Sequence, residues 1–293
     1  MVTLPAAEIR RAVRRGLEED LALGDATTAA LFPVPVPAQA TIIAQQPVVV
    51  AGMAAAIQTF LMVDPSLRLS VSKRDGDRAK NGERLLQIDG DGRSILQAER
   101  VALNFLQHLS GIATLTQQIC RAVRDYPTRI LDTRKTLPGW RTLQKWAVAL
   151  GGGTNHRYSL SDGILIKDNH LALLRRHRRP VEAACRLARR HRTGTLPIIV
   201  EVESLSEVRQ AIAGKPDVIL LDNMAPDMVR RAVGLINKRA LVEVSGGVTL
   251  KNVRAMAAAG ADRISIGALT HSAPAATISL AMTSARRAQR RHR

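Results

Sequence analysis

The chain has 293 residues, of which 46% are hydrophobic and only 2% are aromatic. It is long enough for one large domain or two smaller ones, with a core of aliphatic side chains. The net charge of +18 predicts anionic partners, for which nucleic acid, a membrane surface and small polyanionic substrates are the candidates.

Several signals bear on where the protein works. Cys120 and Cys185 stand far apart and outside any C-x-x-C pair, which favours neither a zinc site nor a disulfide framework and fits a reducing compartment. The longest apolar stretch, 48–57, contains Gly52 and is too short to span a bilayer. The arginines near the N-terminus are followed by no apolar segment of a signal peptide. We therefore expect a cytoplasmic protein without a membrane segment.

The first third of the chain is predicted to be an α+β module. A helix is expected over 5–20, where the apolar residues fall on one face. A long helix is expected over 99–126, with a break at Ser110-Gly111. The other elements expected here are a strand over 40–50, a helix over 51–63 and strands over 67–71 and 85–88.

From residue 130 onward the chain contains six short apolar runs, each followed by a polar or glycine cluster. The last four recur every 21 to 23 residues with helical segments between them. This alternation predicts a parallel α/β barrel, whose functional residues gather at the carboxyl ends of the strands. The runs are 130–131, 164–166, 198–200, 218–221, 241–244 and 264–266, and helices are expected over 204–213, 226–237 and 249–259.

Basic residues follow the first two runs. Arg134 and Lys135 follow the first run and Lys167 follows the second, so we expect them to face a shared pocket rather than solvent. Arginine offers a planar fork to carboxylate or phosphate, and lysine offers a movable point charge. These residues therefore predict a ligand with several anionic groups. For Arg141 and Lys145, a surface position is an open alternative.

A glycine-rich loop with the sequence GGGTNHR covers 151–157. Three consecutive glycines cost chain entropy, which favours close approach to a ligand or to another backbone; a flexible turn is the alternative. His156 directly precedes Arg157. This position favours an anion contact for His156, and a structural histidine is the alternative.

The later runs are followed by carboxylates and then by glycines. We interpret Glu201 and Asp222 as ligands of ribose hydroxyls or of Mg²⁺, whereas an ion pair is favoured for Glu203. Ser245-Gly246-Gly247 and Gly267-Ala268 are each expected to open a helix whose free N–H groups bind phosphate. Together, the cationic, acidic and glycine-containing strand ends indicate a phosphoribosyl donor and an acidic acceptor.

Several segments resemble the quinolinate phosphoribosyltransferase family, also called nicotinate-nucleotide pyrophosphorylase (carboxylating). The resemblance covers nearly the whole chain in order, and its departures include Ala22 and Tyr158-Ser159, where the family more often has glycine. The segments are EEDLALGDATT (18–28), ERVALNFLQHLSGIAT (99–114), DTRKTLPGWR (132–141), GGGTNHR (151–157), LIKDNH (165–170), VEVESL (200–205), LLDN (220–223), VSGGV (244–248) and ISIGALTHS (264–272).

The resemblance implies an α/β fold: an irregular TIM-like α/β barrel preceded by an open-faced α+β sandwich domain. It also implies a homodimer whose subunits share active sites, and Mg²⁺ as the cofactor. The implied domains are the sandwich over 1–114, the barrel over 115–275, and a C-terminal helix with a basic tail over 276–293 that packs back on the first domain. The tail itself, 285–293, is expected to be a solvated helix end.

The resemblance also implies roles for individual residues. Lys135, Lys167, Glu201 and Asp222 would be catalytic, and Glu201 and Asp222 would hold the metal. The quinolinate-binding residues would be Arg100 (from the other subunit), Thr133, Arg134, Lys135, His156, Arg157 and Lys167. The residues that bind phosphoribosyl pyrophosphate would be Glu201, Asp222, Ser245, Gly246, Gly247, Gly267 and Ala268.

The implied reaction joins quinolinate to phosphoribosyl pyrophosphate with loss of CO₂, giving nicotinate mononucleotide and pyrophosphate in de novo NAD biosynthesis. Alternatives are a paralogue of the molybdenum-associated type and a nicotinate phosphoribosyltransferase. A basic nucleic-acid-binding protein is the alternative from another class. Few aromatic side chains are available for stacking on bases, and the basic residues match no known nucleic-acid module, so we expect neither a nucleic-acid nor a membrane partner.

Overall fold

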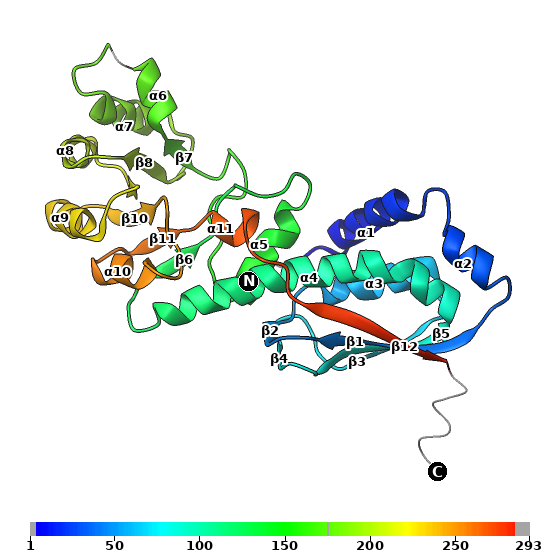
Figure 1. Cartoon of the computed structure of the whole chain (residues 1–293). Coiled ribbons are helices and arrows are strands. Elements are labelled where there is room, and N and C mark those ends of the chain that lie inside the picture. The colour runs from blue at the N-terminus through cyan, green and yellow to red at the C-terminus, as the bar shows by residue number, and fades with distance from the viewer. Residues whose placement is uncertain (1–3, 175, 285–293) are drawn as a thin grey trace. The chain divides into compact units, whose positions relative to one another are not determined.

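The computed structural model of the chain describes residues 4–174 and 176–284, so the predicted solvated helix end at 285–293 lies outside the described residues. Two compact units are present (Figure 1). The first unit combines 4–117, 136–152 and 272–284, and the second, which we call the barrel unit, combines 118–135 and 153–271. Among the described helices, none has both the length and the apolarity needed to cross a bilayer.

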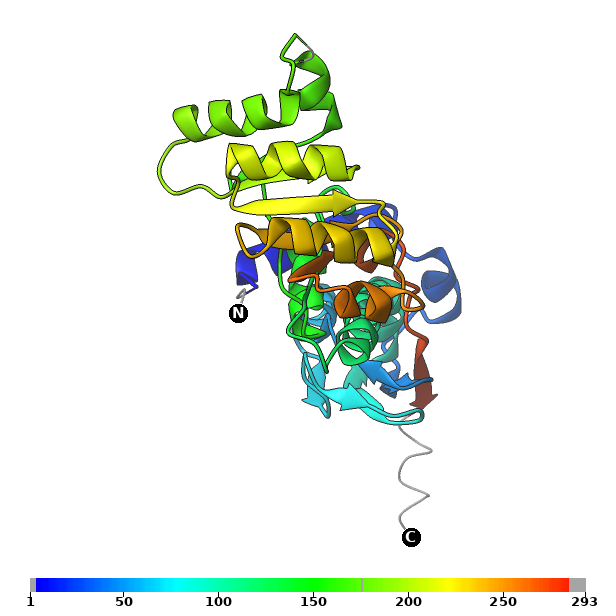
Figure 2. The same cartoon turned by 90° about the vertical axis from the view of Figure 1, so that its left-hand side faces the viewer.

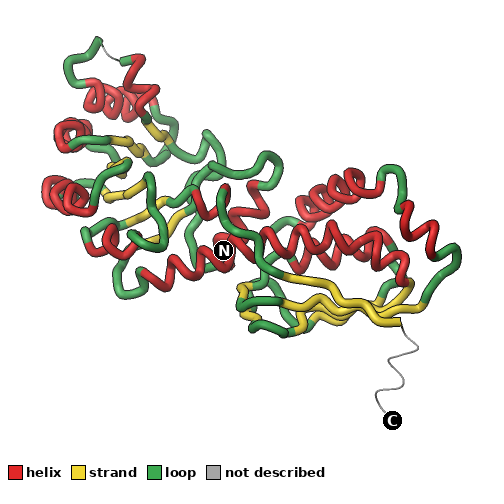
Figure 3. Tube along the Cα trace, viewed as in Figure 1, coloured by secondary structure: helices red, strands yellow, loops and turns green. Residues whose placement is uncertain are grey.

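An antiparallel sheet with helices on one face forms the first unit (Figures 1 and 3). Its order is β12-β1-β5-β3, and Ile42, Ile88, Phe60 and Leu106 are fully buried where the helices meet the sheet. The strands are β1 (Pro37–Ala44), β3 (Arg68–Val71), β5 (Arg84–Asp91) and β12 (Ile278–Ser284), and β2 (Val48–Val49) pairs separately with β4 (Arg78–Ala79). The helices are α1 (Ala6–Leu21), α2 (Ala26–Leu31), α3 (Met53–Val63), α4 (Gly92–Ala122) and α5 (Arg141–Leu150).

Most elements predicted for the first third are confirmed, with one strand divided. The helices predicted over 5–20 and 51–63 are α1 and α3, and the two short strands are β3 and β5. The strand predicted over 40–50 is instead two strands, β1 and β2. Pro47 lies between them and has no N–H to donate to a ladder.

The helix predicted at the start of 276–293 is wrong, because residues 278–284 form the strand β12. β12 pairs antiparallel with β1 along its whole length, from Ala44↔Ile278 to Ala38↔Ser284. The large apolar residues Ile278, Leu280 and Met282 fall at every second position and pack on the core of the first unit. A period of two is the pattern of a half-buried strand, and it was the available signal.

The break predicted at Ser110-Gly111 is also wrong, because α4 runs through it. A Cβ on Gly111 would lie 2.1 Å from the backbone oxygen of Pro274, so the glycine allows two segments to pack closely. Ser110 Oγ accepts a hydrogen bond from the Ala51 backbone N–H at 3.0 Å. These small residues serve packing and do not end the helix.

Residues 136–152 return to the first unit, although a single boundary at residue 114 would place them in the barrel. Trp140 stacks on Phe105 of α4 with ring centroids 4.8 Å apart, and the Gln144 side chain lies 2.8 Å from His108 Nε2. Lys145 is 2% exposed, so the surface position considered for it is wrong. Arg141 is partly buried, and its Nε donates to Thr136 Oγ1.

The barrel unit contains the six predicted parallel strands, in the order β6-β11-β10-β9-β8-β7. They alternate with helices that Figure 2 shows stacked in a row outside the strands. The strands are β6 (Arg129–Leu131), β7 (Ile164–Ile166), β8 (Ile198–Val202), β9 (Val218–Asp222), β10 (Leu241–Ser245) and β11 (Arg263–Ser265). The helices are α6 (Asp168–Leu173), α7 (Pro180–His191), α8 (Leu205–Gly214), α9 (Pro226–Ile236), α10 (Val253–Ala258) and α11 (Ala268–His271).

The barrel is irregular because, within the described residues, no ladder joins β6 to β7. The segment 154–157 lies in this opening and contacts both sides of it. Thr154 forms a parallel bridge to Leu131 at the end of β6, and Arg157 Nη1 donates to the Gly163 oxygen just before β7 at 2.8 Å. The opening therefore admits a loop segment, with its side chains, where a closed barrel would have strands.

The contact at Gly111 predicts a stability difference between two glycine-to-alanine variants. Gly111→Ala should lower the free energy of unfolding by about 1–3 kcal/mol, because the new methyl group has no room. Gly234→Ala, inside α9 with nothing within 4 Å of the new Cβ, should raise it by about 0.5–1 kcal/mol. Denaturant unfolding of both variants measures the difference, and equal stabilities would contradict the packing.

Candidate active site

A cavity of about 340 Å³ lies among the side chains at the carboxyl ends of the barrel strands. It contains the basic and acidic strand-end residues that the sequence analysis singled out. The lining residues are Thr133, Arg134, Lys135, His156, Arg157, Leu165, Lys167, Glu201, Leu220, Asp222, Glu243, Ser245 and Ser265. Alternate side chains of a strand point to the same face. For this reason three strands each contribute two lining residues that are two positions apart: Leu165 and Lys167, Leu220 and Asp222, and Glu243 and Ser245.

Two arginines give the cavity a concentrated positive charge. Burial, and next the nearby charge of Arg134, lower the pKa of Arg157, while the charges of Asp162 and Glu243 act in the opposite direction. Arg157 is only partly anchored, since Nη1 donates to Gly163 O whereas its buried Nε has no hydrogen-bond partner in the described part of the chain. A dianionic ligand would relieve the repulsion between the two guanidinium groups.

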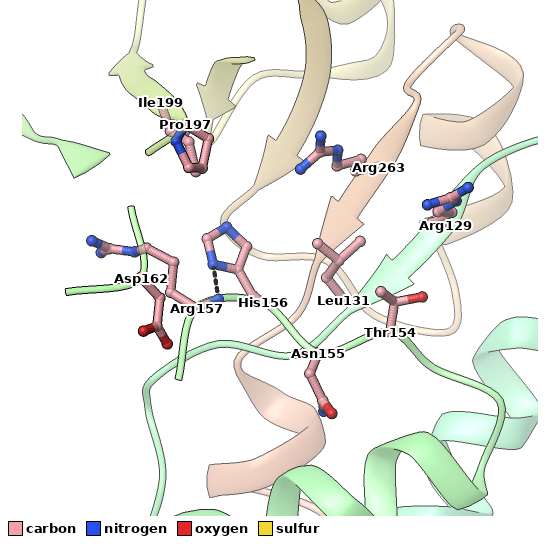
Figure 4. A pocket seen from close by; sticks show the side chains of 10 residues that line it. All are labelled: Arg129, Leu131, Thr154, Asn155, His156, Arg157, Asp162, Pro197, Ile199 and Arg263. Atoms are coloured by element: carbon pink, nitrogen blue, oxygen red, sulfur yellow. Dashed lines mark hydrogen bonds between the residues drawn. The ribbon is translucent and has the colours of Figure 1, made fainter. Parts of the chain in front are cut away.

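His156 is bound by protein groups on both ring nitrogens. Its Nε2 lies 3.2 Å from Glu243 Oε1, and its Nδ1 accepts a hydrogen bond from the Arg157 backbone N–H at 2.7 Å (Figure 4). The backbone N–H of His156 donates to Asp132 Oδ1 at 2.8 Å, and Asn155 Nδ2 donates to Asp132 Oδ2. Asp132 and Glu243, both fully buried, therefore hold the loop segment 154–157 in place.

Glu243 is a residue of this cavity that the sequence analysis did not single out. It lies in the run 241–244 and is the only charged residue of the sequence LVEV. A single charged residue within a buried strand is expected to have a partner, and this was the signal that could have identified it.

Lys167 and Glu201 form an ion pair across the neighbouring strands β7 and β8. The Lys167 side chain is 46% exposed and the Glu201 side chain is 9% exposed, so the pair joins the buried wall of the cavity to its mouth. Asp222 is less enclosed, and its Oδ2 accepts a hydrogen bond from Asn223 Nδ2 at 2.7 Å. Asp222 therefore keeps oxygen lone pairs that a ligand or a metal ion can use.

The glycines after β10 form a tight turn against the end of β9. Gly246 and Gly247 have φ values of +84° and +59°, and a Cβ on Gly246 would lie 2.2 Å from Asn223 Oδ1. Ser245-Gly246-Gly247 does not open a helix, contrary to expectation, because α10 begins only at Val253. Ser245 lines the cavity, whereas Gly246 and Gly247 are not among its lining residues.

Gly267 directly precedes a helix, as predicted, since α11 begins at Ala268. A Cβ on Gly267 would lie 3.0 Å from both Lys135 Cδ and His271 Nε2. Thr270 Oγ1 donates to the Lys135 backbone oxygen at 2.7 Å. The glycine thus lets the Lys135 side chain pass close to the start of α11.

The remaining predicted residue, Arg100, lies on an exposed part of α4 in the first unit. It is not among the residues that line the cavity.

A second cavity of about 230 Å³ includes residues from the amino ends of the strands (Figure 4). His156 and Arg157 line both cavities, so both cavities reach the loop segment 154–157. The residues of the second cavity are Arg129, Leu131, Thr154, Asn155, His156, Arg157, Asp162, Pro197, Ile199 and Arg263.

The fold and the first cavity define a class of α/β-barrel protein in which basic and acidic side chains share one mouth at the carboxyl ends of the strands. Two family profiles match the chain: the C-terminal domain of quinolinate phosphoribosyl transferase over 112–281 and its N-terminal domain over 25–110. The chain belongs to the quinolinate phosphoribosyltransferase family.

Individual relatives agree with the family assignment. A probable nicotinate-nucleotide pyrophosphorylase (carboxylating) of Bacillus subtilis is 38% identical over 94% of this chain and 94% of its own length. Quinolinate phosphoribosyltransferase (decarboxylating) 1b of Nicotiana tabacum is 37% identical over 94% of this chain and 83% of its own length.

Solved structures confirm the predicted combination of an N-terminal antiparallel sheet and a parallel α/β unit. NadC from Streptococcus pyogenes has a TM-score of 0.89 at 37% identity, covering 97% of this chain and 99% of that one. Human nicotinic acid phosphoribosyltransferase has a TM-score of 0.60 at 12% identity, covering 94% and 73%. The likeness to the human protein shows the fold alone.

The turn after β10 predicts different outcomes for two adjacent glycines. Gly246→Ala should weaken binding of phosphoribosyl pyrophosphate strongly, because the new Cβ overlaps Asn223 and displaces the turn. Gly247→Ala has the same left-handed strain, of about 1–2 kcal/mol, but no atom within 4 Å of the new Cβ, and should be mildly affected. Calorimetric titration with phosphoribosyl pyrophosphate tests this, and equal losses would argue against the turn as a phosphate site.

Proposed function

We propose that this chain transfers the phosphoribosyl group of phosphoribosyl pyrophosphate to quinolinate, with decarboxylation, to form nicotinate mononucleotide, pyrophosphate and CO₂. The observation that supports this most directly is the shared cavity of Arg134, Lys167, Glu201 and Asp222 in a chain of this family. The decisive assay mixes the protein with Mg²⁺ and both substrates and measures mononucleotide and CO₂.

Quinolinate has two adjacent carboxylates, and the cavity offers two arginines in electrostatic contact. We assign Arg134 and Arg157, with Thr133, Lys135 and Lys167 around them, to these carboxylates. His156 shares this wall and positions Arg157. Arginine suits this role because its planar fork binds a carboxylate through two parallel hydrogen bonds.

Glu201 and Asp222 face the donor. Their carboxylates bind ribose hydroxyls and offset the positive charge that develops on the ribose ring. The same oxygens, with those of the donor phosphates and water, suit Mg²⁺, which takes few protein carboxylates and would neutralise the departing pyrophosphate. Ser245, Gly246, Gly247, Gly267 and Ala268 supply hydroxyl and backbone N–H groups to the 5′-phosphate.

The reaction has two stages. The ring nitrogen of quinolinate attacks C1 of the ribose, and the C1–O bond to pyrophosphate breaks with its electron pair. The ring nitrogen is then cationic, so the electrons of the bond to the 2-carboxylate can remain on the ring as CO₂ leaves, and C2 takes a proton. The protein contributes orientation and charge stabilisation, with Lys135 and Lys167 as the mobile cations of the site.

The assembly and the selectivity belong to the same proposal. Arg100 reaches quinolinate from the second subunit of a homodimer. Gel filtration of the protein tests the dimer, and the KM for quinolinate of an Arg100→Ala variant tests the role of Arg100.

The paired arginines favour the dicarboxylate quinolinate over the monocarboxylate nicotinate. Cytoplasmic location stays a prediction, and some relatives carry mitochondrial or chloroplastic in their names.

The arginine pair predicts a selective effect on the acceptor. Arg134→Ala should raise the KM for quinolinate roughly 10- to 100-fold, because a charge-assisted hydrogen bond contributes about 1.5–3 kcal/mol. Arg230→Ala, which removes an exposed arginine of α9, is the matched control and should behave as wild type. Steady-state kinetics measures both variants, and a normal KM in Arg134→Ala would contradict the assignment.

The Lys167–Glu201 pair predicts a loss of turnover. Lys167→Ala should reduce kcat about 100-fold or more, as expected when a charge-stabilising group is removed from a site. The circular dichroism spectrum should be unchanged, because the lysine side chain is half exposed. Unfolding of this variant would instead assign the pair a structural role.

A further inference from the structure

Glu243 is a charged residue inside the barrel to which the reaction assigns no task. Its side chain is 0% exposed, and it occupies the third position of β10 between the buried Val242 and Val244. A buried carboxylate is unfavourable unless a proton donor or a cation faces it. His156 Nε2 lies 3.2 Å from Oε1, and the charge of Glu243 also acts on Arg157. Neither Glu243 oxygen has a hydrogen-bond partner in the described part of the chain, so this contact is electrostatic.

The hydrogen bonds of His156 determine which ring nitrogen carries the proton. Nδ1 receives the Arg157 backbone N–H at 2.7 Å (Figure 4), and a backbone N–H can only donate, so Nδ1 is unprotonated. The ring proton is therefore on Nε2, the nitrogen that lies 3.2 Å from Glu243 Oε1. In this arrangement His156 is a neutral link between β10 and the backbone of Arg157.

We propose that Glu243 is a positioning residue for the acceptor site: it holds the His156 ring, and the ring holds the backbone of Arg157. Asp132 binds the main chain of the same loop segment from the end of β6, through the His156 N–H at 2.8 Å. Within the described residues, no strand ladder joins the segment 154–157 to β7, so these side-chain contacts, with the bond from Arg157 Nη1 to Gly163 O, set where Arg157 enters the cavity.

His156 contributes no positive charge to the acceptor site, so the two carboxylates of the ligand are met by Arg134, Arg157 and the lysines. The assignment of the ligand as quinolinate rests on the proposed function. The link from Glu243 through His156 to Arg157 rests on the geometry alone.

Two variants separate the polar contact between Glu243 and His156 from simple occupancy of space. Glu243→Gln keeps a polar oxygen beside His156 Nε2, whereas Glu243→Leu has similar volume and no polar atom. We expect Glu243→Leu to raise the KM for quinolinate roughly 10-fold or more, with kcat and the KM for phosphoribosyl pyrophosphate unchanged. Glu243→Gln should restore the KM for quinolinate to near the wild-type value.

The kinetic experiment has outcomes that would overturn the proposal. These are a wild-type KM in a folded Glu243→Leu variant, equal damage from Gln and Leu, or a parallel rise in the KM of both substrates. The last outcome would indicate a general structural role.

A spectroscopic measurement tests the link without any activity. Long-range ¹H–¹⁵N correlation of histidine-labelled wild-type protein should show His156 as the neutral form protonated at Nε2, with the signal identified by its loss in His156→Asn. A cationic ring, or one protonated at Nδ1, would refute the inference. Because this measurement needs no substrate, it remains decisive even if the protein makes no mononucleotide, which would refute the proposed function alone.

Discussion

Repulsion between like charges in one cavity is the constraint on which the barrel unit depends. Burial first, and the charge of Arg134 second, lower the pKa of Arg157, so the site carries the electrostatic cost of a buried guanidinium group near a second one before any ligand binds. Nearby carboxylates, which contact basic or histidine side chains of the protein, partly offset this electrostatic repulsion. Glu201 pairs with Lys167, and Glu243 faces His156. A dianionic ligand can neutralise the positive charge that remains in the cavity.

The irregularity of the barrel is linked to this arrangement. A strand ladder between β6 and β7 would leave no place for the segment 154–157, which brings His156 and Arg157 to the cavity. The human nicotinic acid phosphoribosyltransferase shares the fold at 12% identity, and a fold of this kind supports many reactions. The choice of ligand therefore depends on the side chains in the opening and at the strand ends.

Much of the secondary structure could be predicted because its signals are local. The run at 218–221 is apolar, has the length of a strand and is followed by an amphipathic helix, and it became β9. The run at 241–244 became β10 although it contains Glu243. The failures have equally physical causes. Ser110-Gly111 resembles a helix break in sequence, but its small size serves a contact with Pro274, a residue more than 160 positions away. No local pattern contains such a contact.

The sequence by itself determined the parallel strands, the basic and acidic character of their ends, and the family to which the chain belongs. These properties follow from hydrophobic periodicity and from motifs whose residues are close together in the chain. Only the tertiary structure decided that Lys167 pairs with Glu201, that Glu243 faces His156, and that 136–152 packs with the first unit. Partners of this kind depend on which side chains the strand order and the opening between β6 and β7 bring within a few ångströms, and that proximity is not encoded in any short segment.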